Sequence, residues 1–119
     1  MNRLFKKERL SSKIKIKQLF EEKNSFLHEG IKVYWNIVNS ESDNISVLFS
    51  VPKKIVPLAT KRNKIKRLLR ESYRIHKSIL NHNKLELNLA FICLSYNFDD
   101  MNKIEEKIKL ILHRLNQEI

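Results

Sequence analysis

The residues with the clearest chemical potential are cations, and they are concentrated in two short segments. Residues 61–77 contain eight Lys and Arg residues and one acidic residue, Glu71, for a net charge of +7. Residues 3–17 contain seven Lys and Arg residues against Glu8, for a net charge of +6. The whole chain of 119 residues carries +11, so the rest of it sums to −2. Because solubility is served better by mixed signs, this segregation predicts a polyanionic partner, with nucleic acid the usual one.

Residues 61–81 predict a helix with one cationic and one apolar side, capped by Thr60. At 100° per residue, an arc of roughly 100° holds only polar residues. They are Asn63, Lys66, Arg67, Arg70, Arg74 and Lys77. Crowding like charges costs about 1 kcal/mol per pair at 4 Å in water. We therefore expect this side to bind phosphate, for which the planar fork of Arg is well suited, and the opposite Ile and Leu side to pack in the core.

Catalysis by the protein itself is not indicated. The one glycine, Gly30, excludes Gly-rich loops that cradle nucleotide phosphates. The acidic pairs at 99–100 and 105–106 point in different directions, so neither forms a converging acid and base. The four His residues lack the spacing of metal ligands. We expect no catalytic residue and no metal site in this chain.

The cellular compartment follows from cysteine usage and apolar runs. A single cysteine, Cys93, cannot form a disulfide within the chain and fits a reducing compartment, where it would be an inert packing residue. The longest apolar run, residues 89–94, is far shorter than a membrane span, and the charged amino terminus is unlike a secretory signal. We expect a cytoplasmic protein without a membrane segment.

The first predicted element is a helix over residues 11–23, capped by Ser11 or Ser12. Three apolar residues follow the helical spacing: Ile16, Leu19 and Phe20. The run KIKIK at 13–17 alternates instead like a strand, so a strand remains the alternative there.

Strands are predicted at 31–39 and 45–51, where apolar and polar residues alternate, with 40–44 as a hairpin connection. Within the first strand, Trp35 falls on the apolar face and Tyr34 on the polar face. Aromatic residues at such spacing more often pack in the core than contact a ligand. The polar neighbours of Tyr34, however, favour its exposure.

The second half of the chain predicts a proline-bracketed loop at 52–57, the cationic helix, a strand and a final helix. The loop leaves room for one further short strand before the cationic helix. Residues 87–94 are apolar at nearly every position, which indicates a strand covered on both faces. Asp99 or Asp100 caps the last helix, whose buried stripe is Ile104, Ile108, Ile111, Leu112 and Leu115. The order predicts one α+β domain over residues 1–119.

The stretch 51–77 resembles the signature of the protein subunit of bacterial ribonuclease P, R-N-x-x-K-R-x-x-R-E/Q. The matching residues are Arg62, Asn63, Lys66, Arg67, Arg70 and Glu71. Six fixed letters at fixed spacing are far more specific than a basic run. Chain length, Arg9-Leu10 before the first helix and the order of elements agree with the family as well.

The resemblance implies a two-layer α-β-β-β-α-β-α sandwich on a four-stranded sheet, with a left-handed βαβ crossover of the kind found in ribosomal proteins. It implies a subunit of an endonuclease whose catalytic RNA, with Mg²⁺, removes the 5′ leader of precursor tRNA. The protein would pair one to one with that RNA and hold no active site or cofactor of its own. Its partners would be the catalytic RNA and precursor tRNA.

The resemblance also assigns roles to individual residues. RNA contact falls to Lys53, Lys54, Arg62, Asn63, Lys66, Arg67, Arg70 and Arg74, and leader contact in a cleft falls to Phe20 and Tyr34. Two departures stand out. Ile16 replaces an aromatic residue found in many relatives, which would remove a base-stacking contact, and Pro57 lies in a loop where many relatives have a Gly.

Two alternatives belong to other functional classes. A structural protein of the ribosome with a similar fold would also bind RNA, but the signature argues against it. A membrane-surface protein would use a basic amphipathic helix. The helix at 61–81 has no Trp or Phe, and the core needs its Ile and Leu side, so this alternative is weaker.

Overall fold

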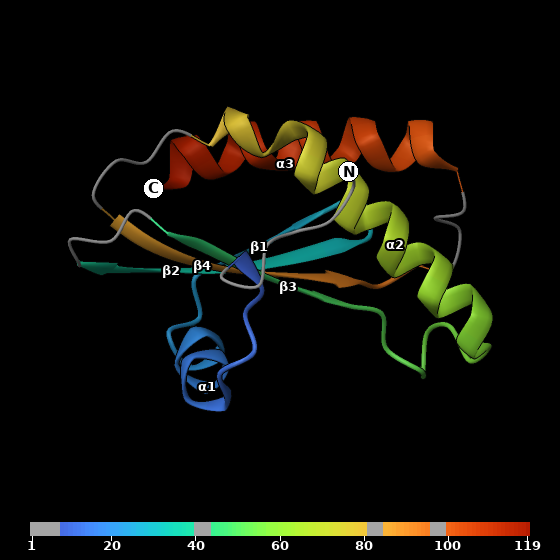
Figure 1. Cartoon of the computed structure of the whole chain (residues 1–119), viewed down its shortest axis with the longest axis horizontal. Coiled ribbons are helices and arrows are strands. Elements are labelled where there is room, and N and C mark those ends of the chain that lie inside the picture. Colours follow the sequence, from blue (N-terminus) through green and yellow to red (C-terminus); the bar gives the residue numbers. More distant parts are fainter. Residues whose placement is uncertain (1–7, 40–43, 81–84, 96–99) are drawn as a thin grey trace.

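The computed structural model describes residues 8–39, 44–80, 85–95 and 100–119 and shows a four-stranded sheet with helices on both faces (Figure 1). The elements, in chain order, are α1 (Lys13–Glu21), β1 (Ser25–His28), β2 (Ile31–Asn39), β3 (Ile45–Ser50), α2 (Ala59–His76), the short 3₁₀ helix η2 (Lys77–Ile79), β4 (Leu85–Cys93) and α3 (Met101–Glu118). The α+β class and the α-β-β-β-α-β-α order are confirmed. Helices α2 and α3 cover one face of the sheet, and α1 lies on the other.

The strand order is β1-β2-β4-β3, with β4 antiparallel to β2 and parallel to β3. The expected hairpin between 31–39 and 45–51 is therefore wrong, because β4 lies between these strands. Strand β4 is apolar on both faces and gains most burial at the centre of the sheet, where Leu87, Leu89 and Phe91 face one layer of helices and Ala90 faces the other. The connection from β3 through α2 delivers β4 to that position.

The additional short strand is β1, which precedes β2 and not α2 as expected. The two strands form a hairpin that pairs His28 with Ile31 across a two-residue turn. Both turn residues have positive φ, 43° at Glu29 and 86° at Gly30, as a type I′ turn requires. The single glycine of the chain thus serves a backbone turn.

Helix α1 begins at Ser12, whose Oγ accepts a hydrogen bond from the Lys15 backbone N–H at 3.4 Å, which confirms one of the two expected caps. The helix prevails over the strand alternation of KIKIK because Leu19 becomes fully buried against the sheet. Helix α3 begins as expected, with Asp100 accepting from the Asn102 N–H at 2.9 Å.

Helix α2 begins earlier than expected and ends sooner. Its cap is Leu58, which has extended backbone angles and makes no side-chain cap bond, so Thr60 lies inside the first turn. The Leu58 carbonyl accepts the Arg62 N–H at 3.0 Å and closes that turn without a hydroxyl cap. The helix ends at His76, and η2 continues it in a tighter form to Ile79.

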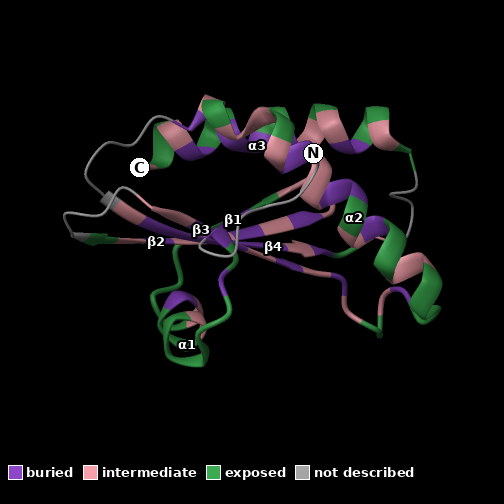
Figure 2. Ribbon diagram, in the orientation of Figure 1, coloured by how far each residue is buried: buried purple, intermediate pink, exposed green. Residues whose placement is uncertain are grey.

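The main core lies between the sheet and the α2/α3 layer (Figure 2). All five expected stripe residues of α3 are completely buried. Tyr73 of α2 packs with Phe49 and Phe91, at ring-centroid distances of 5.9 Å and 6.0 Å. A smaller cluster under α1 consists of Leu10, Leu19 and Ala90. Together the two clusters fix α1 and α2 on opposite faces.

Candidate nucleic-acid interface

The helical pattern of α2 is confirmed in three dimensions. Asn63 and Arg67 are exposed, and Lys66, Arg70 and Arg74 are half-buried along the same side. The opposite side is buried and consists of Ile65, Leu68, Leu69, Ser72 and Tyr73. As the amphipathic pattern predicts, one side of α2 packs in the core and the other side presents cations.

Three arginines of this side have no acidic partner among the residues that the structure describes. Within the described ranges, no carboxylate forms an ion pair with Arg67, Arg70 or Arg74. The Nε atom of Arg74 is buried and has no hydrogen-bond partner in the described part of the chain. A buried donor without an acceptor is costly in an isolated protein, and an external anion would satisfy it.

Lys77 is the exception on this side. Its Nζ lies 2.8 Å from Oε2 of Glu8, whose side chain is 11% exposed. The pair ties the segment before α1 to the end of α2. Lys77, expected on the cationic arc, is therefore held by an internal partner.

The loop between β3 and α2 presents the paired lysines. Ile55 and Val56 both donate their backbone N–H groups to the Pro52 carbonyl at 3.0 Å, which makes a compact turn with Lys53 and Lys54 exposed at its tip. Lys53 and Lys54 are therefore exposed in the loop that directly precedes α2.

Arg62 has a structural contact in addition to its expected role. Its Nη1 donates to the carbonyls of Val56 and Pro57, at 3.0 Å and 2.7 Å. Arg62 thereby braces the loop against the first turn of α2, while Pro57 keeps its carbonyl directed toward the helix. The sequence alone did not reveal this bracing contact.

The expected leader residues come together on the other face of the sheet. The rings of Phe20 and Tyr34 meet edge to face, with centroids 4.7 Å apart, and Nζ of Lys32 lies 5.3 Å from the Tyr34 ring centre. Phe20 and Tyr34 are half-buried, so each retains exposed ring surface. Tyr34 lies on the polar face as expected, and Trp35 packs against the main core. Ile16 packs beside Phe20 in the small cluster.

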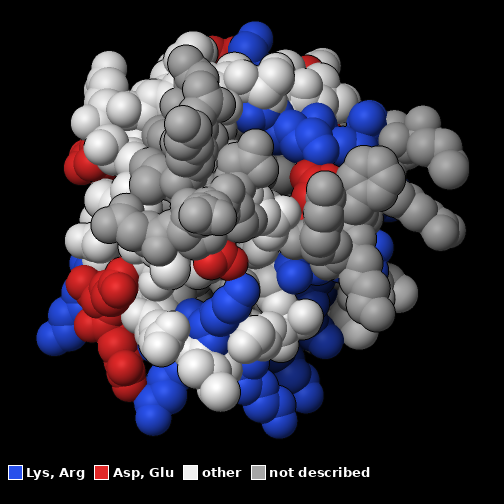
Figure 3. All heavy atoms as spheres, turned by 60° about the vertical axis from the view of Figure 1, so that its left-hand side comes forward, with Lys and Arg blue, Asp and Glu red and all other residues white. Residues whose placement is uncertain are grey.

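Lys and Arg atoms cover more of the described surface than acidic atoms on the side of the molecule drawn in Figure 3. The α2 side and the Phe20–Tyr34 contact lie on opposite faces of the sheet, and β3 is the edge strand between them. A strand of nucleic acid that touches both can pass around this edge.

The segment that lines this edge was not predicted as part of the site. Arg9 forms a parallel bridge with Val47 of β3, and the Leu10 N–H donates to the Val47 carbonyl at 2.9 Å. Residues 8–10 thus extend the sheet by a short fifth segment. A run of only three residues has no periodicity to reveal such pairing.

Burial favours the neutral forms of two titratable groups, Tyr73 and Cys93. Burial, with a smaller effect from Glu8, raises the pKa of the Tyr73 phenol above its ordinary value. Burial also raises the pKa of the Cys93 thiol, against a smaller opposing effect of the Ser95 backbone. The thiol donates a hydrogen bond to the Ser95 carbonyl at 2.9 Å. A neutral, buried thiol is a poor nucleophile, which agrees with the packing role expected for Cys93.

No three His, Cys, Asp or Glu side chains gather as metal ligands in residues 8–39, 44–80, 85–95 and 100–119. Nε2 of His76 lies 2.7 Å from Oε1 of Glu105, between α2 and α3. No helix in the described part of the chain is long and apolar enough to cross a bilayer.

Comparison with known proteins agrees with this geometry. The family model for ribonuclease P matches residues 4–116. A ribonuclease P protein component of Porphyromonas gingivalis is 32% identical over 117 residues, covering 94% of this chain and 85% of that protein. One from Chlorobium phaeobacteroides is 30% identical over 130 residues, covering 97% and 89%.

Solved structures give the same result. The RNase P protein of Staphylococcus aureus superposes with a TM-score of 0.72 at 25% identity, over 91% of this chain and 94% of that one. The RNase P protein of Thermotoga maritima superposes with a TM-score of 0.73 at 28% identity, over 90% and 96%. Sequence and fold comparisons therefore point to one family.

Proposed function

Since this chain belongs to the ribonuclease P protein family, we propose that it binds the catalytic RNA of ribonuclease P and assists removal of the 5′ leader from precursor tRNA. The observation that supports this most directly is the unneutralised cationic side of α2. The alternative of a structural ribosomal protein receives no support from the family match.

Contact with the catalytic RNA is assigned to α2 and the loop before it. From Asn63 to Arg74 the helix axis rises about 16 Å, which is long enough to face several phosphates. Lys53 and Lys54 extend this surface beyond the start of the helix. Arg67 and Arg70 lack internal acidic partners within the described residues, so phosphate binding breaks no ion pair of the protein.

The leader of precursor tRNA is assigned to the surface where α1 packs on the sheet. Phe20 and Tyr34 can offer ring surface to a base, and Lys32 adds a charge for the phosphate beside it. Ile16 offers apolar contact without a stacking ring. If a base stacks on Phe20, Phe20→Ala should reduce the preference for precursor over mature tRNA about 5- to 150-fold, from 1–3 kcal/mol per stacked base.

Hydrolysis is assigned to the RNA subunit together with the Mg²⁺ ions that it binds. The protein contributes positive charge that holds RNA phosphates together, so the ribonucleoprotein needs less Mg²⁺. One protein copy per RNA and a cytoplasmic location complete the proposal.

Reconstitution tests the proposal. The purified chain, mixed with a ribonuclease P RNA and a 5′-extended tRNA at low Mg²⁺, should stimulate cleavage at the mature 5′ end. If about five phosphates are neutralised, the logarithm of RNA affinity should fall with log salt at a slope of about −3.5 to −4.5. Cleavage that the protein does not stimulate, or a slope near zero, contradicts the proposal.

A further inference from the structure

A pocket at the open edge of β3 carries an inference that rests on the proposed function and extends it. The pocket encloses about 290 Å³ and lies between the segment before α1, strand β3 and helix α2. Its polar side chains are Arg9, Ser11 and Arg70, and its floor is Val47, Leu48 and Phe49. Two arginines from distant parts of the sequence therefore line one pocket beside β3.

Among the described residues, neither guanidinium has an acidic partner, since no carboxylate there pairs with Arg9 or Arg70. Glu8, the acid next to Arg9 in sequence, pairs with Lys77. Arg74, one turn beyond Arg70, adds the buried Nε that has no acceptor among the described residues. The region therefore carries an excess of positive charge.

The backbone supplies a further donor. The Leu87 N–H of β4 donates to the Asn44 carbonyl at 3.1 Å. From Asn44 onward, the backbone N–H and C=O groups of every second residue therefore point toward β4. Val47 points the other way and accepts the Leu10 N–H. Phe49, two residues further, turns its backbone N–H to the same outer side, where the pocket lies.

We propose that this pocket binds one backbone phosphodiester of RNA, with Arg9 and Arg70 gripping its oxygens and Ser11 as an additional hydroxyl donor. A phosphodiester fits because the walls are cationic while Leu48 and Phe49 offer apolar surface to the adjoining ribose. Ser11 directly precedes the α1 cap, and Arg70 belongs to α2, so the phosphate bound here lies on the path between the α2 side and the Phe20–Tyr34 contact. Arg9 thereby becomes part of the RNA-binding surface.

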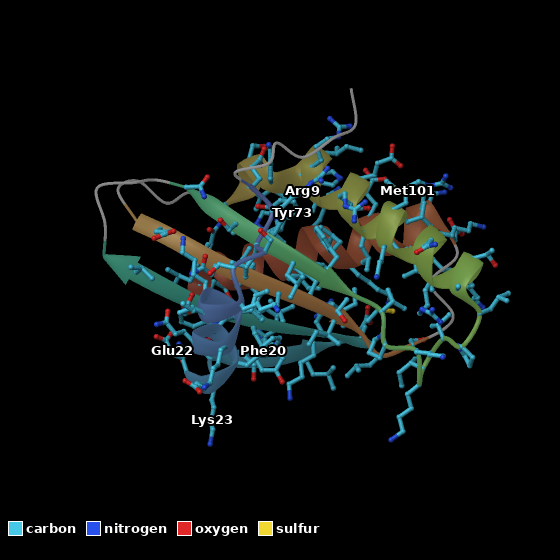
Figure 4. All side chains as sticks on the ribbon, turned by 60° about the horizontal axis from the view of Figure 1, so that its bottom comes forward. Arg9, Phe20, Glu22, Lys23, Tyr73 and Met101 are labelled. Atoms are coloured by element: carbon cyan, nitrogen blue, oxygen red, sulfur yellow. The ribbon has the colours of Figure 1, made fainter. Side chains whose placement is uncertain are left out.

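The test compares two single neutralisations in the full chain. Figure 4 shows Arg9 beside the end of α2 and Lys23 at the far end of α1. Both residues are exposed, so Arg9→Gln and Lys23→Gln remove one charge each from opposite parts of the molecule. Binding to a ribonuclease P RNA would be measured from 50 to 200 mM salt.

Arg9→Gln should weaken RNA binding about 3- to 10-fold and make the log–log salt slope shallower by about 0.7 to 0.9, while Lys23→Gln should change neither. Arg9→Lys should keep the slope and recover part of the affinity. Arg9→Gln combined with Arg70→Gln should lose less affinity than the two single losses multiplied, because both residues grip one phosphate. Parental affinity and slope in Arg9→Gln would overturn the proposal.

A second measurement needs no variant and covers the case in which Arg9→Gln alters the thermal midpoint. Phenylglyoxal modification of the parent protein, mapped by mass spectrometry, should show Arg9 and Arg70 protected together when RNA is bound. Protection of Arg67 without Arg9 overturns this inference but leaves the proposed function standing. A parent protein without salt-dependent RNA binding rejects both.

Discussion

Helices α2 and α3 have the same length and lie in the same layer, but they differ in the charge that they carry. Each has 18 residues and buries one side against the same face of the sheet. Helix α2 carries seven Lys and Arg residues and one Glu, a net charge of +6, whereas α3 carries four and three, a net charge of +1. Packing thus constrains only one side of each helix, and the other side is free to serve a different purpose.

Two of the four cations of α3 make contacts within the protein. Lys107 pairs with Glu29 at 2.8 Å and lowers the pKa of that carboxyl, mainly through the hydrogen bond between them. The guanidinium of Arg114 lies 4.2 Å from the Phe26 ring centre. Arg67 and Arg70 of α2 have no comparable contact within the described ranges. We infer that α3 stabilises the fold, and that α2 both stabilises it and binds RNA.

The largest expected effect comes from the buried side of α3. Ile111→Ala removes a completely buried side chain and should lower the free energy of unfolding by about 2–5 kcal/mol. Urea denaturation measures this, with Ile111→Val as a control that should cost about 0.5–1.5 kcal/mol. The RNA affinity of the folded protein should stay the same, and a selective loss of RNA binding would break the distinction between the helices.

The next effect comes from the exposed side of α2. Arg67→Gln with Arg70→Gln should weaken RNA binding about 10- to 100-fold and make the salt slope shallower by about 1.4 to 1.8, since two phosphate contacts are lost. The matched control, Lys103→Gln with Lys109→Gln, removes two exposed charges from α3 and should have little effect. Circular dichroism should be unchanged in both, and unfolding of the α2 variant would make its Arg residues structural.

A smaller effect follows from the phenol buried under α2. Burial raises the pKa of Tyr73, so the folded state keeps its proton at a pH where the unfolded chain loses it. This stability is fully present below about pH 10 and should be lost above it at about 1.4 kcal/mol per pH unit. Denaturation at pH 9 to 11 measures the loss. In Tyr73→Phe, the free energy of unfolding should fall less steeply between pH 9 and 11. The same slope as in the parent protein would show that Tyr73 does not cause this pH dependence.

The smallest effect concerns a cation of α3. Arg114→Gln removes the contact with the Phe26 ring and should lower the free energy of unfolding by about 0.5–1 kcal/mol, without changing RNA affinity. In thermal and urea denaturation, Arg114→Gln should be less stable than Arg67→Gln. In RNA binding, Arg67→Gln should be the weaker of the two. Equal RNA losses in the two variants would mean that net charge alone, and not its place, governs binding.

Local periodicity made the helices predictable. Five buried residues of α3 and the opposed sides of α2 follow from a rotation of 100° per residue, which every helix obeys whatever it packs against. The ends were less predictable. Thr60 looked like a cap, but the Leu58 carbonyl and the Arg62 side chain completed the first turn without it.

The candidate site was predictable in part. The cationic side of α2 came from charge and spacing, whereas Phe20 and Tyr34 were assigned by family resemblance, and their residue types alone favoured the core. Their 4.7 Å contact joins α1 to β2 through tertiary packing. Arg9 was missed as a pocket residue because its neighbour Arg70 lies 61 positions away in sequence.

By itself the sequence determined the α+β class, the faces of its helices and the segregation of positive charge, because these depend on residue type and short-range spacing. Only the tertiary structure decided that β4 enters between β2 and β3, that Glu8 pairs with Lys77, and that Arg9 and Arg70 line one pocket. Such contacts join residues far apart in sequence. Which of them form depends on how the whole sheet and its helices bury apolar surface together, so no local pattern records them.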